Sequence, residues 1–303
     1  MKRLLKWLAI VFGVILLVIG GFLVYVYTAS ANLMARTYTG IQPPQVTIPT
    51  DAASIARGKY LAEKVAICVE CHGEDLGGKV VQDDAAFGRL VSANLTRGRG
   101  GLPADYSDQD FVRVLTHGVK RDGKSVIFMP SVDYVFTPED LGAIVAYVKS
   151  MPPVDRTVPA MSVGPMARAL GLFVDFPLAS AAMIDHTKPR LADRPNPADA
   201  VAVGKYLVSS AGCVGCHNPQ FTGGSGPPPG GANLTPVGIG TWSERDFMTA
   251  LRTHKRPNGS SIDEAMPRVY GEMSDADLSR IFAYLKTVPP AGKKTANQEK
   301  AGN

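Results

Sequence analysis

Residues 68–72 read CVECH and residues 213–217 read CVGCH, and these two stretches contain all four cysteines of the 303-residue chain. Each lies within a longer repeated sequence, because GKYLAEKVAICVECHG from Gly58 returns as GKYLVSSAGCVGCHN from Gly204. Self-similarity over such a distance is typical of a duplicated structural unit. The sequence therefore predicts two copies of one fold, each built around a Cys-x-x-Cys-His motif.

Further matches between the two copies show where each repeat begins and ends. Asn94-Leu95-Thr96 returns as Asn233-Leu234-Thr235, and both copies end in an apolar helical pattern followed by two prolines. Between the copies, a proline-rich stretch contains a short helical pattern at Met166, Leu170 and Phe173, which we expect to pack across the junction of the two repeats. The expected layout is an N-terminal region with an anchor at 1–27, a tether at 28–50, the first repeat at 51–153, an inter-repeat segment at 154–196, the second repeat at 197–290 and a disordered tail at 291–303.

The N-terminal region has the length and composition of a membrane span. Residues from Trp7 to Tyr27 include no charged side chain, and as a helix these 21 positions extend about 31 Å, close to the hydrocarbon thickness of a bilayer. Basic residues precede the run and no acidic residue occurs before Asp51, which predicts a cytoplasmic N-terminus with the repeats outside. The alternative is a cleaved signal peptide ending at Ala29-Ser30-Ala31, but the run is longer than a usual signal core.

Composition excludes several classes of protein. Four cysteines are too few for a disulfide scaffold, and 45% hydrophobic residues are too many for a disordered chain. The net charge of +5 owes three charges to Lys2, Arg3 and Lys6, so the remainder has no basic excess of the kind that marks a nucleic-acid-binding surface. We expect an exported, membrane-anchored protein that does not bind nucleic acid.

Wherever the repeats show a local pattern, that pattern is helical. Thr137 precedes a proline and two carboxylates, which are the preferred residues of a helix N-terminus, and apolar residues then follow at helical spacing across 141–148. Ser274 begins the equivalent helix of the second repeat, and Ser107 and Ser243 begin a middle helix in each. No stretch alternates between apolar and polar residues over enough positions to predict a β-strand. The expected class is all-α.

The histidine that follows the second cysteine decides between several uses of a cysteine pair. In an exported protein two cysteines at this spacing could form a disulfide, a redox dithiol or half of a zinc site. With an adjacent histidine, however, the two thiols can add to the vinyl groups of a haem, and the imidazole then lies under the iron as the proximal ligand. Two such motifs in one register predict two covalently bound haem c groups, on Cys68 with Cys71 and on Cys213 with Cys216, with iron ligands His72 and His217.

On these motifs each repeat resembles a class I-like cytochrome c domain, and the whole resembles the membrane-anchored multihaem cytochrome c subunits of bacterial alcohol and gluconate dehydrogenase complexes. The resemblance covers about 51–290. It implies a close crossing of the first and last helices of each repeat at Gly58 and Gly204. The chain departs from those subunits in two respects: they commonly carry three haems where this chain has two motifs, and their anchor is C-terminal.

The second ligand of each iron has two candidate pairs. Met129 and Met266, each followed by proline, align at an offset of 137 residues, and the resemblance implies a distal methionine in this context between the middle and last helices. His117 and His254 align at the same offset only if a one-residue gap lies upstream of them. We favour the methionines over the histidines. Further polar side chains that could meet haem propionates are Arg89, Arg97, Arg99, Asn94 and Asn233, although for the arginines we favour the alternative that they are simply solvated.

These features together predict one-electron transfer and no catalytic residue. The resemblance implies a carrier on the periplasmic side of the bacterial inner membrane, relaying electrons from an exported dehydrogenase toward a quinone or a terminal oxidase. The alternative is a dihaem enzyme, either a peroxidase or a thiosulfate-oxidising cytochrome. A peroxidase needs an iron with an open coordination site, and two paired methionine ligands argue against it.

Overall fold

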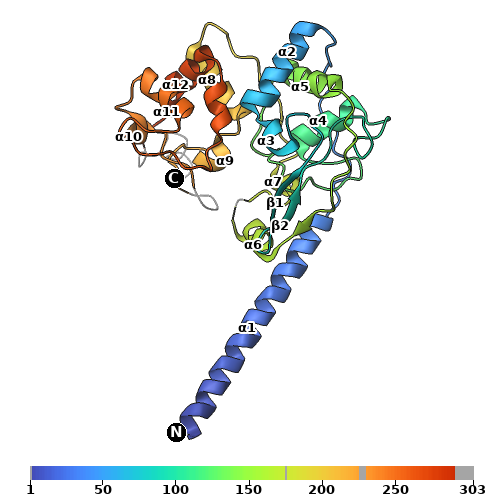
Figure 1. Ribbon diagram of the computed structural model, residues 1–303, viewed down its shortest axis with the longest axis vertical. Coiled ribbons are helices and arrows are strands. Elements are labelled where there is room, and N and C mark those ends of the chain that lie inside the picture. The colour runs from blue at the N-terminus through green and yellow to red at the C-terminus, as the bar shows by residue number, and fades with distance from the viewer. Residues whose placement is uncertain (1, 175, 225–229, 291–303) are drawn as a thin grey trace.

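A long N-terminal helix leads into a globular part made of two groups of helices (Figure 1). The computed structural model describes residues 2–174, 176–224 and 230–290, so the tail predicted at 291–303 lies outside the described residues. The helices of the first repeat, blue to green, and those of the second repeat, orange to red, lie side by side above the end of the long helix.

Helix α1 runs from Lys2 to Ala35 and contains the whole charge-free run. Among the described residues it is the one helix long and apolar enough to cross a membrane. It continues beyond Tyr27, where we expected it to end. Side chains of Thr28 and Ser30 donate hydrogen bonds of 2.8 and 3.2 Å to carbonyls of the preceding turn, which keeps these polar residues compatible with the helix. The helix therefore extends into the first part of the segment that we predicted as a tether.

The rest of that segment follows the surface of the first repeat. The Tyr38 N–H donates to the Gly123 carbonyl at 2.8 Å, and Thr37 forms an isolated β-bridge with Lys124. Val46 and Ile48 pack against the hydrophobic core. Because both main-chain and side-chain contacts hold it, this stretch attaches the first repeat closely to the end of α1.

The predicted helix N-termini are confirmed. Thr137 accepts a hydrogen bond from the Asp140 N–H, and Ser107 and Ser243 each form a capping box with the aspartate three residues later.

The helices of the first repeat are α2 (Ala52–Tyr60), the π-helical turn η1 (Leu61–Val65), α3 (Cys68–His72), α4 (Asp108–His117) and α5 (Pro138–Ser150). Those of the second are α8 (Ala200–Ser210), α9 (Val214–His217), α10 (Pro236–Ile239), α11 (Glu244–Thr253), the 3₁₀ turn η2 (Arg268–Glu272) and α12 (Asp275–Leu285).

In each repeat the first helix packs against the last, α2 against α5 and α8 against α12. The crossing requires glycine, because a Cβ atom placed on Gly58 would lie 1.9 Å from the Ala143 carbonyl oxygen. A Cβ on Gly204 would lie at the same 1.9 Å from the Arg280 carbonyl oxygen. The close crossing that the resemblance implied is thus present in both repeats.

The all-α prediction is wrong for one region, where three short strands form an antiparallel sheet in the order β1-β2-β3. The strands are β1 (Val80–Asp84), β2 (Gly88–Val91) and β3 (Ser162–Val163). Most of β1 is exposed, so its sequence lacks the alternation that marks a half-buried strand. The hairpin depends on its turn instead, where the Asp84 carboxylate accepts from the N–H groups of Ala86 and Phe87 at 2.8 Å.

The inter-repeat segment packs on the first repeat and on α1. It contains β3, α6 (Pro165–Phe173) and α7 (Ser180–Met183). We expected the helical pattern at 166–173 to cross the junction of the repeats, but α6 packs against α1. Further along, the Arg190 guanidinium donates to the carbonyls of Thr116, Ser131, Val132 and Tyr134 at 2.9 to 3.2 Å, which ties this segment to the end of α4 and to the loop after it.

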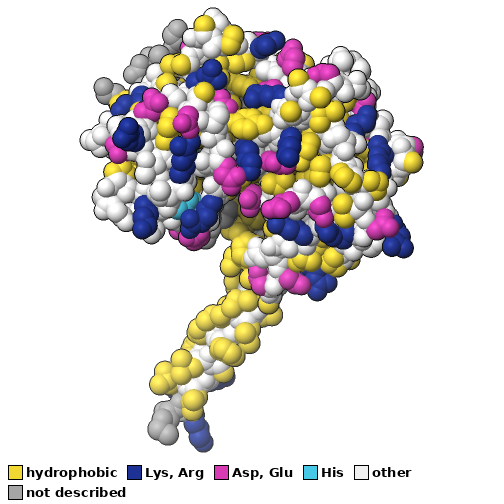
Figure 2. Space-filling model, turned by 45° about the horizontal axis from the view of Figure 1, so that its top comes forward, with side chains coloured by type: hydrophobic (Ala, Val, Ile, Leu, Met, Phe, Trp, Pro, Cys, Tyr) yellow, Lys and Arg dark blue, Asp and Glu magenta, His cyan; other side chains and the backbone are white. Residues whose placement is uncertain are grey.

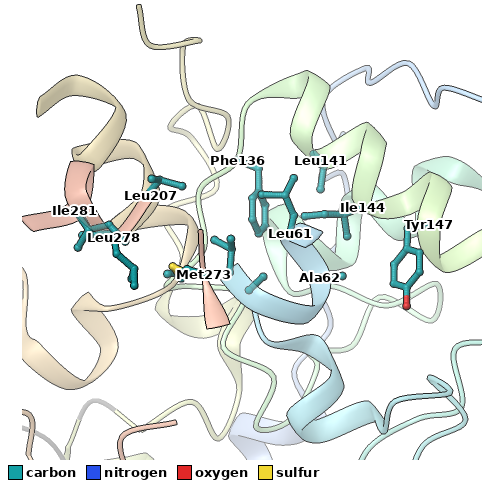
Figure 3. Close-up of a cluster of buried hydrophobic side chains, with 14 of the residues drawn as sticks. Leu61, Ala62, Phe136, Leu141, Ile144, Tyr147, Leu207, Met273, Leu278 and Ile281 are labelled. Atoms are coloured by element: carbon teal, nitrogen blue, oxygen red, sulfur yellow. The ribbon is translucent and has the colours of Figure 1, made fainter. Parts of the chain in front are cut away.

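A single hydrophobic core extends through both repeats (Figure 3). Leu61, Leu141 and Ile144 contribute from the first repeat, and Leu207 and Leu278 from the second. All five side chains are almost fully buried. A shared core of this kind makes the two repeats one packing unit.

Candidate functional site

Both Cys-x-x-Cys-His motifs begin after a residue in the left-handed region. Ile67, immediately before Cys68, has φ of 46°, and Gly212, immediately before Cys213, has φ of 66°. The turn separates the preceding helix from a new short helix, which contains the whole motif in α3 and follows Cys213 as its N-cap in α9. A β-branched isoleucine at positive φ is strained, and such strain is concentrated at functional sites.

The four cysteines form no disulfide with one another, and each motif has one cysteine that is more buried than the other. Cys68 and Cys213 are half-buried, and burial raises the pKa of each thiol to about 12. Cys71 and Cys216 are exposed. Each motif therefore presents one thiol toward the interior and one toward the outside, on a single helical turn.

The histidine of each motif is held by a main-chain carbonyl. His72 Nδ1 lies 2.8 Å from the Ala93 oxygen, and His217 Nδ1 lies 2.7 Å from the Ala232 oxygen. A carbonyl only accepts, so the proton is on Nδ1 and the lone pair of Nε2 is free, which is the tautomer that a metal ligand needs. Burial lowers the pKa of both imidazoles and favours the neutral form. Two thiols and a neutral, oriented imidazole fit the requirements of covalently bound haem.

The loops that supply these carbonyls are built alike. Asn94 Oδ1 accepts from the Thr96 N–H at 2.9 Å, and Asn233 Oδ1 accepts from the Thr235 N–H at 2.9 Å. These asparagines, which we considered for haem propionates, therefore fix the turn beside the histidine-binding carbonyl. The candidate arginines bond to protein groups: Arg89 to Asp83, Arg97 to the carbonyls of Pro103 and Tyr106, and Arg99 to Asp155.

Two tyrosines that were not recognised from the sequence bind the main chain just before each motif. The Tyr134 hydroxyl donates to the Ala66 carbonyl at 3.0 Å, and the Tyr270 hydroxyl donates to the Ala211 carbonyl at 2.8 Å. Ala66 and Ala211 each lie two residues before the first cysteine of a motif. Burial raises the pKa of both phenols well above the ordinary value, so both remain donors. Their offset of 136 residues was the signal available in the sequence.

The two candidate methionines lie in loops after the middle helix of each repeat, and both are half-buried. In the first repeat the Met129 carbonyl accepts hydrogen bonds from the Ser180 hydroxyl and from the Ser131 N–H. In the second, the Met266 N–H donates to the Asp263 carbonyl at 3.0 Å. The inter-repeat segment thus supports the Met129 loop directly, through Ser180.

The two candidate histidines are not equivalent positions. Helices α4 and α11 end at Gly118 and His254, both left-handed, with φ of 63° and 57°. His117 is therefore equivalent to Thr253, and its Nδ1 lies 3.1 Å from Nδ1 of His186. His254 is buried, and neither of its ring nitrogens has a hydrogen-bond partner among the described residues. A buried imidazole without partners is costly, which is a further sign that a bound group belongs in the second repeat.

The interface between the repeats is reciprocal. The Tyr60 hydroxyl of α2 donates to the Asp277 carboxylate of α12 at 2.7 Å and accepts from the Ser274 N–H at 3.1 Å. The Tyr206 hydroxyl of α8 donates to the Asp140 carboxylate of α5 at 2.6 Å and accepts from the Thr137 N–H at 3.4 Å. Each repeat therefore binds the N-terminus of the other's last helix, and the two halves of the contact are related by an approximate twofold axis.

This interface brings the two motifs near each other. A Cβ atom on Gly215, inside the second motif, would lie 2.7 Å from the Asp133 carboxylate of the first repeat. The buried Tyr270 phenol lies close enough to both motifs that negative charge on Cys213 or on Cys68 raises its pKa further. Both motifs thus flank one contact region inside the molecule.

Comparisons with known proteins agree with this geometry. Residues 201–289 match the family described as cytochrome c, and residues 53–148 match the family described as cytochrome c oxidase, cbb3-type, subunit III. Each match contains one Cys-x-x-Cys-His motif.

Several cytochrome subunits are similar over most of the chain. The fructose dehydrogenase cytochrome subunit of Gluconobacter japonicus is 30% identical, over 89% of this chain and 60% of its own length. The cytochrome c subunit of a quinone-dependent alcohol dehydrogenase from Gluconacetobacter polyoxogenes is 27% identical over 89% and 62%, respectively. The gluconate 2-dehydrogenase cytochrome c subunit of Pantoea cypripedii is 27% identical over 81% and 61%.

The chain spans about 60% of the length of these relatives. The family matches, the motif chemistry and the relatives point the same way. The chain contains cytochrome c domains, which carry covalently bound haem c, and it is a homologue of the cytochrome c subunits of fructose, alcohol and gluconate dehydrogenases.

Proposed function

We propose that the protein is a dihaem electron carrier, with one haem c on Cys68 and Cys71 and a second on Cys213 and Cys216. The observation that carries the proposal is the repeated clamp on the motif histidine, in which a main-chain carbonyl accepts from Nδ1 at 2.8 Å in one repeat and 2.7 Å in the other. A clamp present twice indicates two sites of the same kind.

The distal ligands that we propose are Met129 and Met266. Two repeats that bind the same group in the same way use equivalent residues, and this criterion removes the histidines, because Gly118 occupies the position of His254. A thioether favours ferrous iron relative to a second imidazole and so raises the reduction potential.

The protein's own residues then have limited tasks. The haem supplies the one-electron chemistry when bound. The Ala93 and Ala232 carbonyls orient the proximal imidazoles, and Tyr134 and Tyr270 support the main chain that carries the cysteines. Because oriented ligands and burial are the main means of tuning such a site, these contacts set its potential rather than perform a reaction.

We further propose that the carrier lies outside the cytoplasmic membrane of a bacterium, anchored by α1, and that it passes electrons from a dehydrogenase toward a quinone or a terminal oxidase. The similar subunits of fructose, alcohol and gluconate dehydrogenases support a dehydrogenase as donor. The basic residues at the start of α1 support this orientation.

Mass spectrometry and absorption spectroscopy test the haem assignment. The full-length mature chain is expected to carry the added mass of two haems, and its ferric form to show the far-red band of thioether-ligated iron. Met129→Ala and Met266→Ala are each expected to remove about half of that band, whereas His254→Asn, which tolerates the left-handed backbone, leaves it intact. An undiminished band in either methionine variant, or a chain with free thiols, contradicts the proposal.

Co-purification tests the partner. A dehydrogenase subunit is expected to accompany the full-length protein from gently solubilised membranes and to reduce both haems when its substrate is added. Isolation of the haem-loaded protein without any dehydrogenase, together with failure of purified dehydrogenases of this type to reduce it, contradicts the proposed donor but leaves the haem assignment standing.

A further inference from the structure

Helix α6 of the inter-repeat segment lies against the membrane-spanning helix. The Phe173 ring stacks on the Phe22 ring, with centroids 5.8 Å apart and an interplanar angle of 15°, and it also contacts the Tyr25 ring at 6.4 Å. Phe22 belongs to the charge-free run, five residues before its end at Tyr27. At 1.5 Å per residue, this places Phe173 about 7.5 Å inside the apolar part of α1.

A second contact fixes the other part of α6 nearer the end of the span. The Arg168 guanidinium lies 4.7 Å from the centroid of the Tyr27 ring and donates to the Ser30 hydroxyl at 2.9 Å. Its Nε atom also donates to the Val163 carbonyl, the last residue of β3. The arginine therefore sits at the boundary of the apolar run, while the end of α6 with Phe173 lies deeper, the arrangement that snorkelling basic side chains adopt at membrane interfaces.

Apolar side chains of α6 and of its C-cap residue Val174 remain about half exposed among the residues that the structure describes. Met166, Phe173 and Val174 are 49%, 55% and 45% exposed. Arg168 is the sole charged residue in the nine-residue helix PMARALGLF. Figure 2 shows an apolar stalk below a globular surface on which charged side chains are widespread.

We propose that α6 is a second membrane-contacting element, lying in the lipid interface beside α1 with Phe173 and Val174 among the acyl chains. One spanning helix lets the attached domain rotate and tilt, whereas a second contact beside it fixes both. Helix α6 thus determines how the first repeat is oriented over the bilayer.

Spin labelling of the full-length protein in phospholipid vesicles tests this. The thioether-bound cysteines do not react, so Phe173→Cys and, separately, Val174→Cys each provide one labelling site; the second leaves the Phe22–Phe173 stack intact. Power saturation gives the accessibility of the label to oxygen, which concentrates in lipid, and to a water-soluble nickel complex. The saturation measured under nitrogen, with neither reagent present, is subtracted from each value. This removes the contribution of the haem iron to relaxation of the label.

Two control positions calibrate the result. Leu16→Cys, in the middle of the span, reports lipid, and Val237→Cys, a 64% exposed position on α10, reports water. We expect the ratio of oxygen to nickel accessibility to exceed unity at positions 173 and 174, as at 16, and to fall below unity at 237. Nickel accessibility like that of position 237 overturns the proposal, and so does low accessibility to both reagents, which identifies a protein partner on α6 instead.

The labelling test is independent of the proposed haem function. Label uptake by the parent chain, without an introduced cysteine, reports free native thiols and therefore a failure of the haem assignment. The accessibility ratio at 173 and 174 reports only the environment of α6.

Discussion

The reciprocal tyrosine contacts predict that the two repeats unfold together and that removing two hydroxyl groups weakens them by a measurable amount. The perturbation is Tyr60→Phe combined with Tyr206→Phe. Each change removes a hydrogen bond to a carboxylate, of 2.7 and 2.6 Å, and leaves a helix N-cap N–H without its acceptor.

The expected loss of stability depends on which hydrogen bonds each carboxylate keeps after the substitution. A hydrogen bond to a charged group contributes about 1.5–3 kcal/mol to stability. The lower end applies, because Asp140 keeps its two hydrogen bonds to Arg57 and Asp277 keeps its contact with Arg280. We therefore expect about 1.5 kcal/mol for each single variant and about 3 kcal/mol for the double variant if the two contacts act independently.

The assay is urea-induced unfolding of the haem-loaded, full-length protein in detergent, followed by circular dichroism of the helices and of the bound haem. The parent protein is expected to show one transition with both probes, because one core spans both repeats. Tyr284→Phe is the matched control, since its hydroxyl makes no hydrogen bond to any residue that the structure describes, and it should change stability by less than about 0.5 kcal/mol. A double variant as stable as this control, or two separate transitions in the parent, would refute the reasoning.

Three further predictions concern other contacts. Gly204→Ala is expected to lower the free energy of unfolding by about 3 kcal/mol, measured by urea titration, because its Cβ would overlap the Arg280 carbonyl oxygen. Burial, with the nearby charges of His186 and Arg190, lowers the pKa of His117 from 6.5 to about 4, so the unfolded chain binds a proton that the folded chain does not. Stability should therefore fall as the pH drops from about 6.5 toward about 4, and thermal melts of His117→Gln should show a shallower pH dependence. Arg190→Met should lower the melting temperature by several degrees, because four carbonyls lose a charged donor; an unchanged melt would mean that the segment at 154–196 is held by other contacts.

The sequence contained enough information to predict the repeated parts of the molecule. The caps at Ser107, Ser243 and Thr137 follow from side chains that act within three residues, and local interactions of this kind can be read from spacing alone. The glycines at the two helix crossings were recognisable because they recur with the motif. Local chemistry and repetition therefore predicted the helices, and the motifs predicted the cofactor.

Contacts between distant segments could not be predicted in this way. Tyr60 and Tyr206 recur, as do Asp140 and Asp277, but recurrence does not say that each tyrosine binds the aspartate of the other repeat. The hairpin β1–β2 was missed because its stability depends on a turn rather than on an apolar face. Similarly, the position of α6 depends on rings that lie 151 residues apart, Phe22 and Phe173.

These long-range contacts connect the parts of the molecule one after another, from α1 to the second repeat. Phe173 and Arg168 join α6 to α1, Arg190 joins the inter-repeat segment to the first repeat, and the tyrosine–aspartate contacts join the first repeat to the second. Each connection is made by buried or charge-assisted contacts rather than by a flexible linker, so each part fixes the orientation of the next. If α6 lies in the lipid as proposed, the second repeat inherits a fixed orientation without touching the membrane, and a redox partner docking there meets its motif in a constant position. If each repeat also carries a haem and α1 anchors the chain, as proposed, loss of the tyrosine contacts is expected to slow electron transfer through the second repeat while leaving the first repeat in place on the membrane.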